Sequence, residues 1–367
     1  MAIPFFDYPA LFARHETEIA DTILAVMRSG KYILQEELVD FETELAEYLG
    51  IRAAIGVGSG TEGIFIGLKA ADLGSGDEII LPSHTFIATA SAVTAAGATP
   101  VLVDVRDDHL MDPQSVEAAI TDRTRAIIPV HLNGRTCEMD TIGEIAGKHS
   151  LCIIEDAAQA LGSSFKGRFA GTFGMTGSFS FYPAKLLGCF GDGGAVVTDD
   201  QAVAERIFSL RDHGRMDDGG VREWSYNTRL DNIQAALLSL KLRYFDDDLR
   251  RRREIAAAYD SRLGRYEELL LPPPPVESGD HHDVFQNYEV ECTRRDDLRE
   301  HLAGLAVGTI IQWGGTAVHQ FPALGFDVQL PVTERIMRDS LLLPMHPALS
   351  DEDVDGVCDA IDSFFVA

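Results

Sequence analysis

The sequence has few cysteines, few basic residues and no long hydrophobic run, and each shortage excludes a class of protein. Five cysteines are scattered over 367 residues without CxxC spacing, so neither a disulfide framework nor a zinc site is expected. Lysine and arginine number 31 against 58 aspartates and glutamates, which gives a formal net charge of -27. This charge disfavours nucleic acid and anionic membranes as partners, because both require basic surface.

The sequence also predicts neither a targeting segment nor a membrane-spanning segment. The first residues do not join a basic segment to a long apolar core, and no later segment reaches membrane-spanning length. We therefore expect a cytoplasmic protein. Hydrophobic residues make up 46% and charged residues 24% of the chain, as in soluble globular proteins. The length suggests about two domains.

Apolar strands alternate with helices through the first half of the chain. Helices are predicted in two pieces within 16–49, after Gly60, at 112–120 with Asp112 as a cap, and at 137–150. The predicted strands span 53–57, 78–86, 99–105, 125–131 and the start of 151–162. Almost wholly apolar strands separated by helices predict an α/β fold, with a mostly parallel sheet covered by helices on both faces.

The last third of the chain is more mixed. One long helix is predicted after Asp231, and the proline run 272–275 marks a loop or linker. Strands at 285–292 and 308–315 and helices at 294–305 and 351–365 follow. This mixture predicts a smaller C-terminal α+β domain, so the expected domains are 1–245 and 246–367.

Lys185 stands in a turn between two predicted buried strands, with no acidic residue in the four positions before it. An ammonium in such a place is poorly solvated, so its pKa tends to fall, and an unprotonated amine can form a Schiff base with an aldehyde. The alternative is a lysine that reaches the surface from the end of a strand.

The segment Gly58-Ser59-Gly60-Thr61-Glu62-Gly63 has GxGxxG spacing between a strand and a helix. A dinucleotide site would also need an acidic residue at the end of the next strand, but that strand ends in Pro82 and Ser83. Two interpretations remain: a phosphate site at the helix N-terminus, or a plain turn with a Ser/Thr cap.

Asp156 and Gln159 follow the strand that contains Cys152, where catalytic groups of parallel sheets gather. Asp156 alone could equally be a turn residue. Together, a lysine amine, a strand-end carboxylate and a phosphate-suited helix start are what pyridoxal phosphate needs, since the carboxylate keeps the ring nitrogen protonated. His281 and His282 have only Asp283 beside them, and no metal site is expected.

Several motifs in order resemble one family. They are GSGT at 58–61, PSHTFIATASAV at 82–93, PVHLNGRTCEMD at 129–140, EDAAQALGS at 155–163, SFSFYPAKLLGCFGDGGAVVT at 178–198 and YNTRLDNIQAALLSLKL at 226–242. They resemble the DegT/DnrJ/EryC1/StrS family of pyridoxal-phosphate-dependent aminotransferases, which act on nucleotide-linked keto sugars and have the fold-type I architecture. The resemblance covers nearly the whole chain.

The resemblance implies a role for individual residues. Lys185 would form the Schiff base, Asp156 would contact the pyridine nitrogen, and Gln159 would lie on the side of the phenolic oxygen. The phosphate would be held by backbone amides around Gly60, Thr61 and Glu62, by the Ser180 hydroxyl and by Asn227 of the other subunit, while Phe86 would stack on the ring and Arg229 would meet the substrate's diphosphate.

The region 311–320 departs from the family's usual His-Tyr-Pro-like run, and the substrate is least defined there. Trp313 and His319 are candidates for contact with the sugar or nucleotide, although an aromatic residue after an apolar strand is often part of the core. Arg229 could likewise be a solvated residue in a surface ion pair. His84, beside the cofactor segment, is either a neighbour of the ring or a structural histidine.

The resemblance implies a homodimer with shared active sites. L-glutamate would give its amino group to the cofactor, leaving pyridoxamine phosphate and 2-oxoglutarate, and a nucleotide-linked keto-deoxyhexose, dTDP-linked by preference, would receive it at C4 or C3. Two alternatives remain: a sugar dehydratase of the same fold, which has a histidine in place of Lys185, and a cofactor-binding regulator without turnover. A third, a nicotinamide dehydrogenase, fails because the acidic residue is missing, and it would leave Lys185 unexplained.

Overall fold

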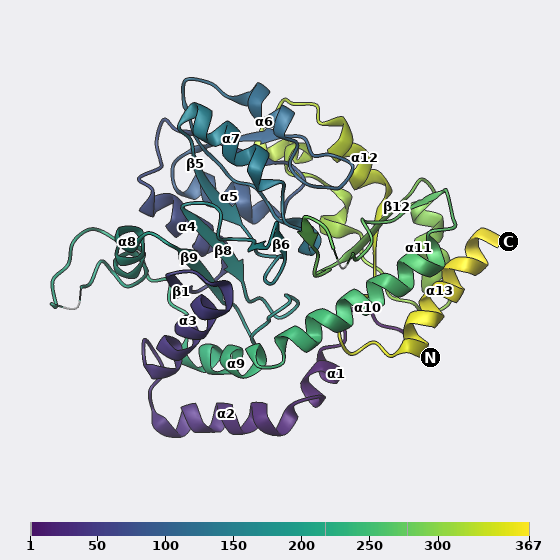
Figure 1. The fold of residues 1–367 in the computed structure, drawn as a ribbon, viewed down its shortest axis with the longest axis horizontal. Coiled ribbons are helices and arrows are strands. Elements are labelled where there is room, and N and C mark those ends of the chain that lie inside the picture. The colour runs from purple at the N-terminus through teal and green to yellow at the C-terminus, as the bar shows by residue number, and fades with distance from the viewer. Residues whose placement is uncertain (1, 217, 277, 367) are drawn as a thin grey trace.

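The structure is a computed structural model that describes residues 2–216, 218–276 and 278–366. A seven-stranded sheet lies at the centre of its larger part (Figure 1), in the order β1-β9-β8-β5-β4-β2-β3. β9 is antiparallel to both neighbours, and the other neighbouring strands are parallel. The strands are β1 (Ala53–Val57), β2 (Glu78–Pro82), β3 (Thr99–Val103), β4 (Thr124–Ile127), β5 (Cys152–Asp156), β8 (Thr176–Ser180) and β9 (Gly194–Thr198). The predicted α/β class with a mostly parallel sheet is confirmed.

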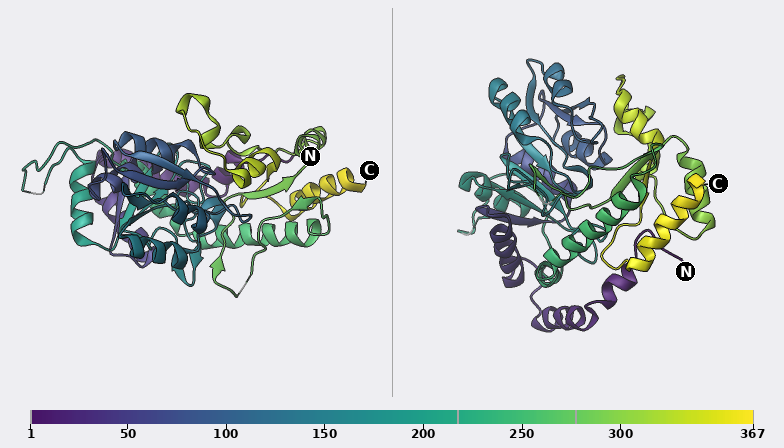
Figure 2. Two further views of the ribbon diagram at one scale, coloured as in Figure 1. Left: turned by 90° about the horizontal axis from the view of Figure 1, so that it is seen from above. Right: turned by 45° about the vertical axis from the view of Figure 1, so that its right-hand side comes forward.

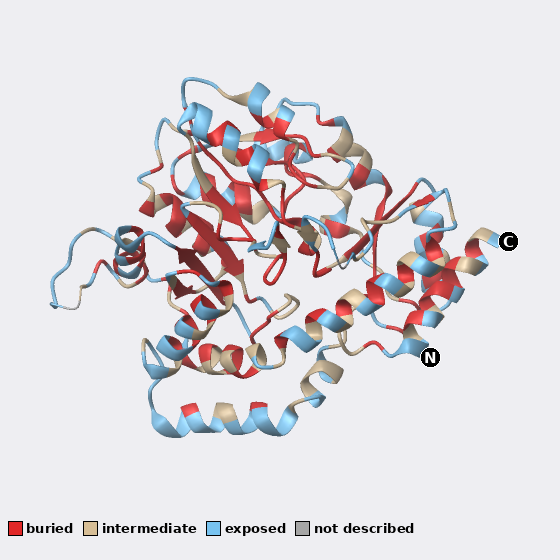
Figure 3. Ribbon diagram, viewed as in Figure 1, coloured by how far each residue is buried: buried red, intermediate tan, exposed pale blue. Residues whose placement is uncertain are grey.

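Helices cover both faces of this sheet, as its apolar strands require. Side chains alternate along β2: Ile79 and Leu81 pack into the cluster beneath α4 and α5, whereas Ile80 packs into the cluster beneath α6 and α7. Buried residues accordingly fill the sheet in Figure 3. The surrounding helices are α2 (Glu16–Ser29), α3 (Glu36–Leu49), α4 (Gly60–Ala70), α5 (Ile87–Ala95), α6 (Pro113–Ala119), α7 (Met139–His149), α8 (Gln201–Arg211) and α9 (Asn232–Leu242).

A second core lies at the other end of α10 (Phe245–Leu263), a long helix that crosses the molecule (Figures 1 and 2). It is built on a small antiparallel sheet in the order β10-β12-β13. The N-terminal Ile3 joins this core and pairs with Val307. The other elements of this part are β10 (Leu269–Leu270), β12 (Tyr288–Cys292), α11 (Arg295–Gly304), α12 (Pro331–Asp339), β13 (Ser340–Leu343) and α13 (Asp351–Val366). The division at residue 245 stays a prediction.

Two predicted elements differ from the structure. The single helix expected after Asp231 is two helices, because Tyr244 turns the chain between α9 and α10 and stacks on the ring of His15 at 4.0 Å. The strand expected at 308–315 is wrong: Ile310 forms only an isolated bridge to Leu342. The following residues form the short helix η2 (Gln312–Gly315), in which Trp313, Gly314 and Gly315 all have positive φ, a conformation that no strand accommodates.

Other elements had no clear signal in the sequence. They are α1 (Tyr8–Ala13), β6 (Ser164–Phe165), β7 (Arg168–Phe169), β11 (His281–His282), η1 (Leu132–Gly134), η3 (Val318–Gln320) and η4 (Pro322–Leu324), besides α8, α12 and β13. Most are too short to show a hydrophobic period. Among the described residues, no helix combines the length and the apolar character needed to cross a bilayer.

Candidate active site

A cavity of about 530 Å³ opens where the strands of the central sheet end. Its walls come from the segments that follow β1, β2, β4, β5 and β8, and from Gln286, Asn287 and Trp313 of the C-terminal part. Parallel strands bring their carboxyl ends to one edge, so segments far apart in the chain meet there. The cavity unites most of the predicted site residues, namely Gly60, Thr61, Phe86, Asp156, Gln159, Ser180, Lys185 and Trp313.

Lys185 lies in the turn between β8 and β9, the position predicted for it, and its side chain lines the cavity. The turn is closed by a hydrogen bond from its backbone N–H to the Tyr182 carbonyl, 2.8 Å. Burial lowers the pKa of the Lys185 ammonium to about 8, and the charge of Asp156 only partly opposes this shift. A measurable fraction of the side chain is therefore a free amine, a nucleophile for an aldehyde, near neutral pH.

Asp156 ends β5 and presents its carboxylate to the same cavity. Thr89 Oγ1 donates to Asp156 Oδ2 at 2.8 Å, and the Ala158 backbone N–H donates to Oδ1 at 3.1 Å. The preceding residue, Glu155, points to the other face, as strand alternation requires, and accepts from His131 Nε2 at 2.8 Å. Asp156 is thus a fixed acceptor suited to a cationic N–H.

The N-terminus of α4 forms the polar end of the cavity. Ser59 caps the helix, and its Oγ accepts from the Glu62 N–H at 3.2 Å, so this amide is already used within the turn. The amides of Gly60 and Thr61 remain at the cavity, beside Ser180. The backbones of Gly194 and Ser59 pack closely here, since a Cβ added to Gly194 would lie 2.5 Å from the Ser59 carbonyl carbon. A helix N-terminus with free N–H groups suits a phosphate.

Gln159 and Phe86 complete the predicted surroundings of a ring. Gln159 Oε1 accepts from the backbone N–H of Asn133 at 2.9 Å, and Gln159 lines the cavity. Phe86 precedes α5 and leaves 54% of its surface exposed, although it too lines the cavity. An exposed aromatic face at a concave site suits stacking against a planar ligand.

Four predicted residues do not line this cavity in the described part of the chain: Glu62, Asn227, Arg229 and His319. Arg229 donates to Asp212 at 2.9 Å, and Asn227 is exposed and bridges to the same residue. Both lie in the segment between α8 and α9. His319 is buried, and its Nδ1 shares a 2.7 Å hydrogen bond with Ser83 Oγ. This contact anchors the C-terminal part on the segment after β2.

Other residues in the cavity were not singled out from the sequence. Thr89 is the clearest, because it lies one helical turn after Phe86 and therefore on the same side of α5. Tyr182, Asp192 and Asn287 also line the cavity. Asn287 comes from a distant segment, and nothing near it in the sequence predicts that it reaches this site.

Comparison with known proteins shows the family of this chain. The sequence profile of the DegT/DnrJ/EryC1/StrS aminotransferase family matches residues 13–362. The dTDP-3-amino-3,4,6-trideoxy-alpha-D-glucose transaminase of Streptomyces venezuelae is 42% identical over 98% of this chain and 95% of its own. A protein of Geobacillus stearothermophilus named pleiotropic regulatory protein is 38% identical over 100% of this chain and 99% of its own.

Solved structures of related proteins have the same fold as this chain. The crystal structure of S. venezuelae DesV in complex with a ketimine intermediate superposes with a TM-score of 0.95 at 41% identity, covering 99% of this chain and 98% of that one. Related structures in pyridoxal phosphate and pyridoxamine phosphate forms also match. The fold expected from the resemblance is thereby confirmed.

Proposed function

The chain belongs to the DegT/DnrJ/EryC1/StrS aminotransferase family, whose cofactor is pyridoxal phosphate, and we propose that it moves the amino group of L-glutamate to a dTDP-linked keto-deoxyhexose. The observation that carries this proposal is the Lys185 amine, with its lowered pKa, in one cavity with Asp156 and the start of α4. A lysine at this position also argues against the dehydratase alternative, which has a histidine there.

The residues present fit the cofactor. The free amides of Gly60 and Thr61 with the Ser180 hydroxyl would hold its phosphate, Asp156 its ring nitrogen and Gln159 its phenolic oxygen, while Phe86 would cover one face. When bound, pyridoxal phosphate withdraws electrons from the substrate carbon attached to it, and this stabilises the carbanion left by proton loss.

Lys185 has two tasks in this proposal. Its amine would hold the cofactor aldehyde while no substrate is present, until the amine of glutamate takes its place. The freed Nζ would then accept the proton from Cα of the donor and give a proton back in the return transfer, and water would release the keto acid and leave the amino group behind. The lowered pKa suits this work, because Nζ must accept and release a proton near neutral pH.

We propose a homodimer in which each subunit completes the other's site. Phe86 and Tyr182 line the cavity yet are 54% and 51% exposed, so the wall of a single chain is open on their side. Asn227 and Arg229 lie outside their own cavity, in the segment between α8 and α9. In the dimer, the partner's Asn227 would reach the phosphate and the partner's Arg229 the substrate's diphosphate.

Sugar recognition is proposed for Trp313, which lines the cavity. The bond to Ser83 suggests that His319 acts by holding this loop in place. We propose the C3 ketone as the reacting group, because the Streptomyces venezuelae relative is named for a 3-amino product.

The first experiment is an absorption spectrum of the purified protein with pyridoxal phosphate, before and after L-glutamate. A visible band that glutamate bleaches supports both the lysine chemistry and the amino donor. Addition of dTDP-linked 3-keto and 4-keto sugars to the bleached protein then tests the acceptor, since the correct ketone restores the band. A band that glutamate leaves unchanged, while sugar ligands still bind, would favour a regulator without turnover.

A further inference from the structure

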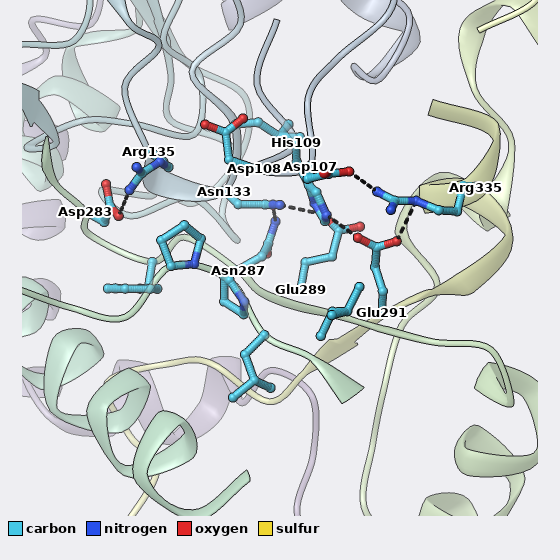
Figure 4. Close-up of a pocket in the computed structure, with 16 residues that line it drawn as sticks. Asp107, Asp108, His109, Asn133, Arg135, Asp283, Asn287, Glu289, Glu291 and Arg335 are labelled. Atoms are coloured by element: carbon cyan, nitrogen blue, oxygen red, sulfur yellow. Dashed lines mark hydrogen bonds and ion pairs between the residues drawn. The ribbon is translucent and has the colours of Figure 1, made fainter. Parts of the chain in front are cut away.

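A second cavity, of about 320 Å³, adjoins the first, and both are lined by Leu132 and Asn287. Its polar wall joins the two parts of the molecule (Figure 4). His109 comes from a loop and Asn133 from η1 of the larger part, and Glu289 and Glu291 come from β12 of the smaller part. A line of hydrogen bonds runs along this wall and ends at Gln159 in the candidate active site.

Asn133 is the residue through which this line reaches the site. Its backbone is left-handed, with φ 54° and ψ 18°, and in this turn its N–H donates to Gln159 Oε1 at 2.9 Å. The side chain is held at both ends: Nδ2 donates to Glu289 Oε2 at 2.6 Å, and Oδ1 accepts from Asn287 Nδ2 at 2.8 Å. Asparagine tolerates this backbone better than most residues, but the conformation still needs support.

Glu289 provides a rigid acceptor for that support. It is 2% exposed, and its Oε2 also faces His109 Nδ1 at 2.9 Å. The other nitrogen of His109 faces Glu291 at 3.1 Å, so both ring nitrogens donate and the ring is an imidazolium. Burial alone would disfavour the Glu289 charge, but the charge and hydrogen bond of His109 outweigh it and lower the pKa of Glu289 to about 2.

We propose that Asn133 and Glu289 are positioning residues for the cofactor ring: Glu289 holds Asn133 in its left-handed turn, and Asn133 turns the Gln159 amide so that its NH₂ group donates to the phenolic oxygen. The step from Gln159 to the ring rests on the proposed function. The Asn133 N–H occupies the carbonyl end of this amide, which leaves the NH₂ end for the cavity.

The test is a pH titration of the visible absorbance of the enzyme with bound pyridoxal phosphate. A hydrogen-bond donor to the phenolic oxygen favours the deprotonated form, in which that oxygen carries the full negative charge. Loss of the donor therefore raises the pH midpoint of the absorbance change. Gln159→Leu removes the donor and is expected to raise the midpoint by about one pH unit, the scale of one hydrogen bond to a charged group. Glu289→Met and Asn133→Ala should raise it by a large part of that shift.

Two further variants separate this chain of contacts from general effects. Asn133→Gly should show a smaller shift than Asn133→Ala, because glycine adopts the left-handed turn freely and keeps the N–H. Glu291→Met removes a carboxylate that pairs with the same His109 but does not contact Asn133, and should leave the midpoint unchanged.

Equal shifts in the Glu289 and Glu291 variants would overturn the proposal, as would a wild-type midpoint in Gln159→Leu or Asn133→Ala. If Glu289→Met does not fold, the two Asn133 variants still decide. Failure of the proposed function looks different, because the wild-type protein would then give no visible band to titrate.

Discussion

Replacing His109 by asparagine is expected to remove a pH-dependent part of the protein's stability. His109 joins the two parts of the molecule, since it lies in the loop before α6 and pairs with Glu289 and Glu291 of β12. Asparagine is the suitable replacement because His109 has φ 67°, a backbone that asparagine tolerates, and because its side chain does not titrate.

The magnitude follows from the pKa shift. Burial disfavours the imidazolium, but Glu289 and Glu291 outweigh it and raise the pKa of His109 from 6.5 to about 9. The His84 ring, 5.4 Å away, has a pKa lowered to about 4, mainly by burial, and remains neutral throughout this range. A shift of this size corresponds to about 3 kcal/mol of unfolding free energy. The lowered pKa of Glu289 reflects the same interaction and is not added.

The sign is fixed by linkage. Because the folded-state pKa is the higher one, the contribution is fully present below pH 6.5 and is lost as the pH rises through about 9. Equilibrium urea unfolding of the wild-type protein and of His109→Asn should therefore differ by up to about 3 kcal/mol near pH 6.5 and converge above pH 9. Groups that titrate alike in both proteins contribute equally to the two unfolding free energies, so their contributions cancel in the difference.

The control is His149→Asn. His149 is exposed at the end of α7 and pairs with neither Glu289 nor Glu291, so this change should not reproduce the loss of about 3 kcal/mol expected for His109→Asn. A wild-type minus His109→Asn difference that stays constant from pH 6.5 to 9.5 would refute the reasoning, because the imidazolium would then not be stabilised by folding.

Three more changes test the active site. Lys185→Ala should abolish both the visible band and transamination, because no other lysine lines the cavity in the described chain; the assays are the spectrum and turnover with glutamate. Thr89→Val should lower the transamination rate about tenfold, since it removes a hydrogen bond to the Asp156 carboxylate. Gly194→Ala should weaken cofactor binding about tenfold or more, because the new Cβ overlaps the Ser59 backbone, as fluorescence titration would measure.

Matched controls exist for the last two changes. Thr94 also lies on α5, and its hydroxyl donates to the Ala90 carbonyl of its own helix, so Thr94→Val should leave the rate unchanged. Gly147 has open space at its Cβ position, so Gly147→Ala should leave cofactor affinity unchanged. An equal loss in a control and its test variant would mean that the effect is not local to the site.

The sequence predicts the fold best where strands are buried on both faces. Residues 53–57 form β1 as predicted, because a continuous apolar run bounded by glycine leaves few alternatives. Asp112 caps α6 as predicted, with its carboxylate accepting from the N–H groups of Gln114 and Ser115. Such features depend on neighbouring residues alone.

The sequence predicts the site less completely, because its supporting contacts join distant residues. Asn133 is 156 positions from Glu289, and His109 is 180 positions from it. No periodicity links such pairs. The strand prediction for 308–315 was wrong for a related reason. The apolar residues of this segment resemble those of a strand, but Trp313 lines the cavity from a left-handed turn, and tertiary contacts determine the shape of that turn.

The charge balance of the cavity bears on how a protein of net charge -27 holds a phosphate. Among its described lining residues, Lys185 is the only cation, and Asp156 and Asp192 are anions. Within one chain the phosphate can therefore draw only on the amides at the start of α4, equivalent to about half a positive charge, and on the Ser180 hydroxyl. This deficit favours the proposed dimer, in which a second chain would supply Asn227 to the phosphate and Arg229 to the substrate's diphosphate. An acidic protein can therefore hold an anionic cofactor, because a cofactor requires only a few oriented groups at one site. Nucleic acids and anionic membranes, in contrast, require an extended basic surface.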